Sequence, residues 1–424
     1  MRSLKAAVIG AGSTYTPELL EGFIERRDYL NFKEIALMDI DEKKLGVISG
    51  LAGRMFKKAG MRCALEPTAD LDEAVRGADY VFAQIRVGGL QARIRDEKIP
   101  LKYGLLGQET TGIGGFMNAL RTVPVMLDVA RRVEALAPGA WLVNFSNPSG
   151  IVADAILNNT GVNMFGLCNC PINMLAEIRA AIRVSIGEDD FGYDYVGLNH
   201  LSWITSVTAG GRDYVADMDK SIRGMLGPEW DDALIHAFPA IPSYYLNYYY
   251  AREKQLEKCL KAEKTRGEEC VEIEGRLLEQ YMDPDLAVKP AELSQRGGAL
   301  YSTAAISAAE AIENDKNEYH VVNVKNGGAL PYLEADDVIE VKCVLNKNGA
   351  KPVKIASAGS RGMAGLIQAV KAYEKLTVSA ALGGSRADAL AALMVHPLIG
   401  DYGKAKGALD EMIQANLDYL PMFR

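Results

Sequence analysis

Two patterns of apolar residues alternate along the first 170 residues. Short continuous apolar runs, typical of buried strands, lie at residues 5–9, 33–40, 79–85, 140–145 and 163–168. Between them, apolar positions recur at the spacing of amphipathic helices at residues 16–27, 42–59, 71–77 and 116–135. Strands that alternate with helices predict an α/β fold with a parallel, doubly wound sheet and helices on both faces.

A polar or small residue lies at the end of each predicted strand or just after it. In chain order these residues are Gly10, Asp39, Arg86, Asn147 and Cys168. In open parallel sheets, functional loops lie outside the carboxyl ends of the strands. The sequence therefore predicts that these side chains gather at one edge of the sheet and form a single site.

The pattern changes after about residue 193. Strand-like segments lie at residues 195–198 and 201–209, and helical segments at residues 264–280, 302–313 and 361–381. No linker rich in Pro, Gly or Ser separates the two halves. We therefore predict two domains that pack directly on one another, one over residues 1–165 and one over residues 166–424.

Composition narrows the class of protein without identifying it. A length of 424 residues suits two domains, and 49% hydrophobic with 24% charged residues is typical of a globular protein. The formal net charge of −8 argues against a nucleic-acid binder and gives no general attraction to anionic membranes. No apolar run approaches the length of a membrane span. Six cysteines in a chain of this length form no disulfide scaffold, which indicates a reducing cytoplasm.

A glycine loop links the first predicted strand to the first predicted helix. Gly10, Gly12 and Ser13 in this loop let the backbone approach a pyrophosphate at the helix N-terminus. Tyr15 stands where the G-x-G-x-x-G pattern has its third glycine. Asp39, at the end of the second strand, is placed to accept hydrogen bonds from an adenosine ribose, which favours NAD over its phosphorylated form. The alternative is an ordinary strand–turn–helix with a capping Asp.

Cys168 and His200 are candidate ligands of a divalent metal ion. Both follow predicted strands and lie in short turns. A thiolate and an imidazole suit a transition metal, and two protein ligands leave positions open for substrate oxygens. Cys170 is more consistent with a small packing residue. The alternative for the pair is a buried thiol and a core histidine.

Three further segments carry candidate chemistry. The tyrosines between residues 244 and 250 fit a core or an oligomer interface, and a catalytic one among them needs a pKa below the usual value of about 10. Arg86, Arg93 and Arg95 either clamp an anion or are simply solvated. The glycine-rich segment 108–115 reads as a loop that lines a pocket or as a plain surface loop.

The chain resembles glycoside hydrolase family 4 at short motifs spread over nearly its whole length. These motifs are Val8-Ile9-Gly10-Ala11-Gly12-Ser13, Gly107-Gln108-Glu109-Thr110, Asn147-Pro148-Ser149-Gly150, Cys168-Asn169-Cys170-Pro171, Gly197-Leu198-Asn199-His200 and Arg296-Gly297-Gly298. Members of this family depend on NAD and Mn²⁺ and depart from two-carboxylate glycoside hydrolysis. The resemblance implies an NAD-binding Rossmann domain over residues 1–165. It also implies a C-terminal α+β domain over residues 166–424, like that of lactate and malate dehydrogenases, which binds substrate and metal.

The resemblance also implies roles for individual residues. Cys168 and His200 match the metal ligands, and Tyr245 matches the catalytic base, with Tyr244 and Tyr248 as its nearest rivals. The positions that match substrate-binding residues are Arg93, Asn147, Asn169 and Arg266. An Asn after the metal cysteine resembles the 6-phospho-β-glucosidase branch, whereas an Asp there resembles the α branch. Because Asn169 cannot donate a carboxylic proton, the resemblance leaves the general acid unassigned, and a water held by Glu109 or by the metal is the candidate.

The implied reaction begins with hydride transfer from C3 of the sugar to NAD⁺. Tyr245 then removes the acidified C2 proton, the aglycone leaves by elimination, water adds, and the hydride returns. We expect a phosphorylated β-glucoside as substrate and a homo-oligomer, either a dimer or a tetramer. The alternatives are a family member that acts on an α-glucoside phosphate, a galactoside or a glucuronide, and an NAD-dependent 2-hydroxy-acid dehydrogenase.

Overall fold

A nine-stranded sheet forms the centre of the molecule in the computed structural model, which describes residues 2–182, 191–216, 218–297, 301–356 and 358–424. Six of its strands run parallel in the order β3-β2-β1-β4-β5-β6. They are β1 (Leu4–Ile9), β2 (Phe32–Met38), β3 (Ala64–Thr68), β4 (Tyr80–Ala83), β5 (Trp141–Asn144) and β6 (Asn163–Gly166). The predicted strands are confirmed, and β3 is an addition. Its largely exposed residues, with Pro67 among them, suit a sheet edge and give no apolar run.

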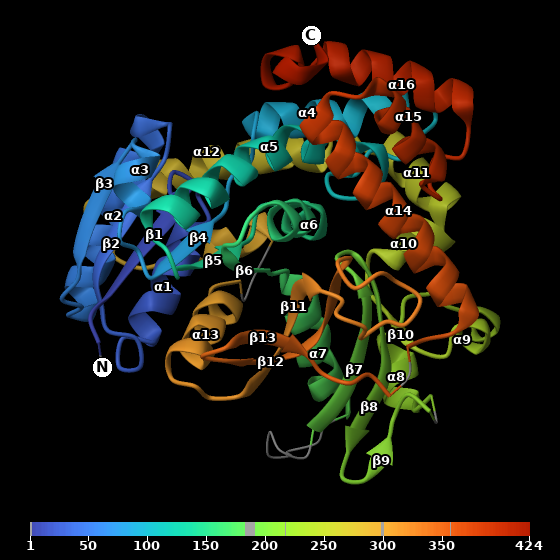
Figure 1. Cartoon of the computed structure of the whole chain (residues 1–424), viewed down its shortest axis with the longest axis horizontal. Coiled ribbons are helices and arrows are strands. Elements are labelled where there is room, and N and C mark those ends of the chain that lie inside the picture. The colour runs from blue at the N-terminus through green and yellow to red at the C-terminus, as the bar shows by residue number, and fades with distance from the viewer. Residues whose placement is uncertain (1, 183–190, 217, 298–300, 357) are drawn as a thin grey trace.

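Helices connect these strands and cover both faces of the sheet (Figure 1). They are α1 (Thr16–Glu25), α2 (Glu42–Ala59), α3 (Leu71–Val75), α4 (Gly89–Leu101), α5 (Gly112–Leu136), α6 (Ser149–Asn159) and α7 (Asn169–Ile182). The predicted α/β architecture is confirmed. The sequence pattern missed α4 because this helix buries the charged residues Arg93, Asp96 and Glu97. A buried face that carries charges does not show the apolar spacing of an amphipathic helix.

The sheet continues beyond the predicted parallel strands at one edge. The antiparallel strands β11 (Glu318–Lys325), β12 (Val338–Asn346) and β13 (Gly349–Pro352) extend the sheet beyond β6. Asn323 of β11 pairs with Gly166 of β6, so residues from the second half of the chain complete the sheet. The boundary at residue 165 falls inside β6 and stays a prediction.

A second sheet stands beside the first and consists of β7 (Phe191–Leu198), β8 (Leu201–Ala209), β9 (Arg212–Asp213) and β10 (Ile241–Pro242). The helices of the second half are α8 (Lys220–Met225), α9 (Asp232–Ala237), α10 (Leu246–Tyr250), α11 (Arg252–Lys261), α12 (Arg266–Tyr281), α13 (Tyr301–Glu313), α14 (Arg361–Gly383), α15 (Arg386–Val395) and α16 (Tyr402–Gln414). The long helix α14 runs from α15 and α16, above α6, down to the second sheet (Figure 1).

Buried side chains from both halves of the chain form one large apolar core. Phe82 of β4, Ile306 of α13 and Ile367 of α14 all belong to it and are fully buried. The halves therefore share a hydrophobic interior, as the missing linker predicts. Among the described helices, none combines the length and the apolar character that crossing a membrane requires.

Candidate active site

A cavity of about 1180 Å³ opens at the carboxyl ends of the parallel strands and is walled by both halves of the chain. Its lining includes Gly10, Gly12, Ser13, Asp39, Arg93, Asn147, Asn169, His200, Tyr245 and Arg266. Cys168 is buried beneath the wall, against His200. The structure therefore brings all the predicted site residues together in one place, as the strand-end positions predict.

The glycine loop is held tightly between β1 and the carboxylate of Asp39. Gly10 has a φ of 88°, a backbone conformation that favours glycine. A Cβ at Gly12 would stand 2.8 Å from Oδ2 of Asp39, because the backbone N–H of Gly12 donates to that oxygen at 2.7 Å. The N–H of Asp41 donates to the other oxygen, Oδ1, at 2.9 Å. This arrangement fixes the Asp39 carboxylate at the cavity wall, close to the start of α1.

Cys168 and His200 are in contact at the cavity wall, where His200 lines the cavity and Cys168 lies beneath it. The Sγ atom of Cys168 is 3.4 Å from Nε2 of His200. Two ligands at about 2.3 Å and 2.1 Å from a shared ion would have nearly this separation in tetrahedral geometry. Among the described residues, no group of three or more His, Cys, Asp or Glu side chains is arranged to hold a metal. A metal here would thus keep open positions for other ligands.

The ionisation states of this region suit metal binding. Burial lowers the pKa of the His200 imidazole to about 4, against the opposing effect of Glu109. His200 is therefore neutral at pH 7, as a metal ligand must be. Burial, together with the neighbouring Cys168, raises the pKa of the Cys170 thiol. Cys170 stays protonated and packs 3.8 Å from the sulfur of Met174, in agreement with its reading as a packing residue.

Tyr245 lies directly on the imidazole of His200. The two rings are stacked with centroids 3.8 Å apart and an interplanar angle of 18°. Tyr244 instead donates its hydroxyl to Glu177 at 2.6 Å, and burial together with this carboxylate raises its pKa. Burial raises the pKa of Tyr248 to about 12. Of the three tyrosines, Tyr245 is the one placed against a candidate metal ligand.

Two arginines and a glutamate form a charged cluster in the cavity wall. Arg86 and Arg93 both bind Oε2 of Glu109, at 2.7 Å and 2.9 Å. Burial would raise the pKa of the Glu109 carboxyl, but Arg86 and Arg93 outweigh it and lower the pKa to about 2. Glu109 is thus ionised at neutral pH. Arg95, the third arginine of the predicted cluster, does not line the cavity.

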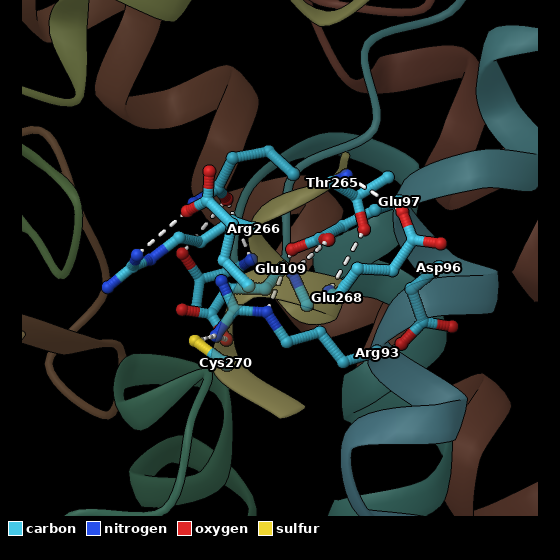
Figure 2. Close-up of polar contacts among 12 residues, drawn as sticks. Arg93, Asp96, Glu97, Glu109, Thr265, Arg266, Glu268 and Cys270 are labelled. Atoms are coloured by element: carbon cyan, nitrogen blue, oxygen red, sulfur yellow. Dashed lines mark hydrogen bonds and ion pairs between the residues drawn. The ribbon is translucent and has the colours of Figure 1, made fainter. Parts of the chain in front are cut away.

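Arg93 and Arg266 reach this region from two different helices (Figure 2). Arg93 of α4 also binds Glu97 at 2.8 Å and has its Nη1 atom 3.9 Å from the sulfur of Cys270 on α12. Arg266 begins α12, where it donates to Glu269 at 2.8 Å and to the Gln295 carbonyl at 2.5 Å. Arg93 is nearly buried, whereas the side chain of Arg266 is 43% exposed, which places it at the rim of the cavity.

The glycine-rich segment 108–115 is not a flexible loop, because its glycines begin the buried helix α5. A Cβ at Gly114 would stand 2.2 Å from the Gln108 carbonyl oxygen, and one at Gly115 would stand 2.4 Å from that of Thr110. These glycines therefore permit close backbone packing. The preceding side chains of Gln108 and Glu109 line the cavity, in agreement with the pocket interpretation.

Three buried side-chain atoms of cavity-lining residues have no hydrogen-bond partner among the described residues. They are the Oδ1 atom of Asn147, the Nδ1 atom of His200 and the Nε atom of Arg296. Buried polar atoms are nearly always hydrogen-bonded, so a bound molecule could supply partners for such atoms. In the sequence, Arg296 stands out only as part of the Arg296-Gly297-Gly298 motif. A lone arginine far along the chain carries no local signal of its position in a cavity.

Comparison with known proteins agrees with this geometry. The family 4 glycosyl hydrolase profile matches residues 5–184, and the profile of its C-terminal domain matches residues 195–399. A probable 6-phospho-beta-glucosidase of Bacillus subtilis is 40% identical over 100% of this chain and 98% of its own length. The 6-phospho-beta glucosidase of Thermotoga maritima, solved with manganese, NAD⁺ and glucose-6-phosphate, has a TM-score of 0.90 and 36% identity. That match covers 98% of this chain and 99% of the other.

A more distant likeness concerns the fold alone. Malate dehydrogenase from Plasmodium falciparum, solved with NADH, has a TM-score of 0.53 and 12% identity over 89% of this chain and 98% of its own. The predicted dehydrogenase-like fold is thereby confirmed. The two matching profiles together span most of the sequence, and the chain belongs to the family 4 glycosyl hydrolases.

Proposed function

We propose that this protein is an NAD- and Mn²⁺-dependent 6-phospho-β-glucosidase. The observation that carries the proposal is the joint placement of the Cys168–His200 pair, the stacked ring of Tyr245 and the glycine loop in one cavity. The names of the similar proteins and the ligands in their structures support the same substrate and cofactors. Asn169, at the start of α7 and in the cavity wall, favours the β branch.

Different residues of the cavity would bind the cofactor and the metal. Gly10, Gly12 and Ser13 would hold the pyrophosphate of NAD, and Asp39 would accept hydrogen bonds from its ribose. Cys168 and His200 would hold the metal. When bound, NAD accepts a hydride from C3 of the sugar and the metal ion polarises the oxygens at C2 and C3.

The sugar would lie between the metal pair and the arginines. Asn147 and Asn169 line the cavity. Arg93 and Arg266 approach from the side of α4 and α12 (Figure 2). The orphaned Oδ1 of Asn147 offers an acceptor for a sugar hydroxyl. The exposed guanidinium of Arg266 is suited to a phosphate.

Tyr245 would remove the proton at C2 once C3 has become a ketone. Its ring is stacked on that of His200, a candidate metal ligand, which supports a role for the phenol near the metal. Replacing Tyr245 with Phe should lower kcat by about 10²- to 10⁴-fold, the usual contribution of a positioned base. Mn²⁺ binding, measured by calorimetry, should persist in this variant, whereas Cys168→Ser should lose it.

An assay with nitrophenyl β-glucoside 6-phosphate, NAD⁺ and Mn²⁺ tests the proposed substrate. We expect hydrolysis without net formation of NADH, together with loss of deuterium from a C2-deuterated substrate. Equal turnover of the unphosphorylated glucoside would contradict the phosphate requirement. Retention of the deuterium would contradict the elimination, and steady accumulation of NADH would point to a dehydrogenase instead.

We also propose that the protein acts in the cytoplasm as a homo-oligomer, either a dimer or a tetramer. All six cysteines are free thiols, which fits a reducing compartment. Sedimentation of the purified protein tests the oligomeric state, and a single species with the mass of the monomer would contradict it.

A further inference from the structure

An ion pair between the two halves of the chain lies at the ribose end of the cavity. The Nζ atom of Lys44 on α2 is 2.5 Å from Oε1 of Glu274 on α12. Both residues line the same cavity as Gly12 and Asp39. The Lys44 side chain is 37% exposed and that of Glu274 is 19% exposed, so both remain within reach of a ligand.

Lys44 belongs to the part of the cavity that contains Asp39. A Cβ built at Gly12 would meet Oδ2 of Asp39 at 2.8 Å and Cβ of Lys44 at 3.2 Å. In dinucleotide-binding folds, an acidic residue at the position of Asp39 accepts a hydrogen bond from the ribose 2′-hydroxyl of NAD. In proteins that bind NADP, a nearby cation accommodates the 2′-phosphate. The side chain of Lys44 therefore begins beside the position at which Asp39 would bind the ribose, and its ammonium group is a nearby cation of this kind.

Glu274 is held firmly in position opposite Lys44. Its helix is tied to α2 by Arg54, which donates to the Tyr281 carbonyl at 2.6 Å and to the Leu286 carbonyl at 2.7 Å. The hydroxyl of Tyr281 also donates to the carbonyl of Thr14 in the glycine loop, at 2.8 Å. The α12 helix is thus anchored to the nucleotide-binding half, and Glu274 is not a freely moving surface group.

We propose that Glu274 makes this site select NAD over NADP by binding Lys44 and adding its own negative charge beside Asp39. The 2′-hydroxyl of NAD can donate to Asp39 and needs no cation. The 2′-phosphate of NADP would instead face two carboxylates, while Lys44 is already neutralised by its partner. The inference rests on the proposed function only in taking this end of the cavity as the adenosine site.

Glu274→Gln tests the proposal, because it removes the charge, keeps the size and releases Lys44. The matched control is Glu272→Gln on the same helix, where Glu272 pairs with Lys264 and is 50% exposed, outside the cavity lining. We expect the ratio of the NADP⁺ to the NAD⁺ dissociation constant to fall about tenfold in Glu274→Gln, which corresponds to ~1.4 kcal/mol. Glu272→Gln should keep the ratio of the unchanged protein.

A second variant shows whether Lys44 causes the gain in NADP⁺ affinity expected of Glu274→Gln. Adding Lys44→Met to Glu274→Gln should return NADP⁺ binding to its original weakness. An unchanged ratio in Glu274→Gln would overturn the proposal, as would a gain that survives the loss of Lys44. Thermal unfolding of each variant confirms that the comparison concerns folded protein.

Calorimetry of cofactor binding needs neither glycoside nor metal, so this test is separate from the proposed activity. Tight NAD⁺ binding with the expected shift in Glu274→Gln, but no hydrolysis of phosphorylated glucosides, would refute the proposed function and leave the selectivity of Glu274 standing. Hydrolysis of phosphorylated glucosides, with an unchanged ratio of the two dissociation constants in Glu274→Gln, would support the proposed function and refute the selectivity of Glu274.

Discussion

Replacing Glu109 with Gln should destabilise the folded protein at neutral pH. Glu109 binds both Arg86 and Arg93, and its pKa is lowered from 4.5 to about 2. One pKa unit corresponds to about 1.4 kcal/mol, so the ionised carboxylate contributes at most about 3 kcal/mol. Its side chain is 20% exposed and solvent screens part of this energy, so we expect a loss of about 2 kcal/mol.

The sign of the pH dependence follows from the lowered pKa. Above pH 4.5 the carboxylate is ionised in both the folded and the unfolded state, and its full contribution to stability is present. As the pH falls from 4.5 toward about 2, the unfolded state takes up its proton first and the contribution is lost. The stability difference between the original protein and Glu109→Gln should therefore shrink in acid.

Denaturant unfolding of the cofactor-free protein, repeated from pH 7 down to the lowest pH at which it folds, measures this difference. The control is Glu257→Gln, which breaks an exposed pair with Lys261 on α11 and should cost less than about 1 kcal/mol at every pH. Equal stability of Glu109→Gln and the original protein at pH 7 would refute the reasoning, and so would a difference that grows as the pH falls.

Two further substitutions test the charged interior and the glycine loop. Arg121→Met should cost about 3–5 kcal/mol in denaturant unfolding, because Arg121 and Asp96 are both almost fully buried and the change leaves Asp96 unpaired. A cost below about 1 kcal/mol would show that water reaches Asp96. Gly12→Ala should weaken NAD⁺ binding by about tenfold or more in calorimetry, since the new methyl group would stand 2.8 Å from Cγ of Asp39. Unaltered affinity would mean that the loop adjusts freely.

Local patterns in the sequence were sufficient for the parallel core and for the part of the cavity that lies at its strand ends. The strand before Gly10 and Gly12 can be recognised from the sequence, because an apolar run and a glycine turn are patterns of residues that are adjacent in the chain. The ends of parallel strands meet at one edge of a sheet, so the positions of Asp39, Asn147 and Cys168 predicted a common site. The structure places all three at the cavity or directly beneath its wall.

Tertiary structure decided whatever depends on partners that are distant in sequence. The helix α4 was missed because its buried face carries charged residues. The pairing of β11 with β6 was missed because no local pattern shows which distant strand will be a neighbour in the sheet. Likewise, the pKa of Glu109 is low because Arg86 and Arg93 lie against its carboxylate. Lys44 pairs with Glu274, which is 230 residues away in the sequence. Spacing along the sequence reports which face of an element is apolar. Charge compensation is settled by distances in space, and only the folded chain provides those distances.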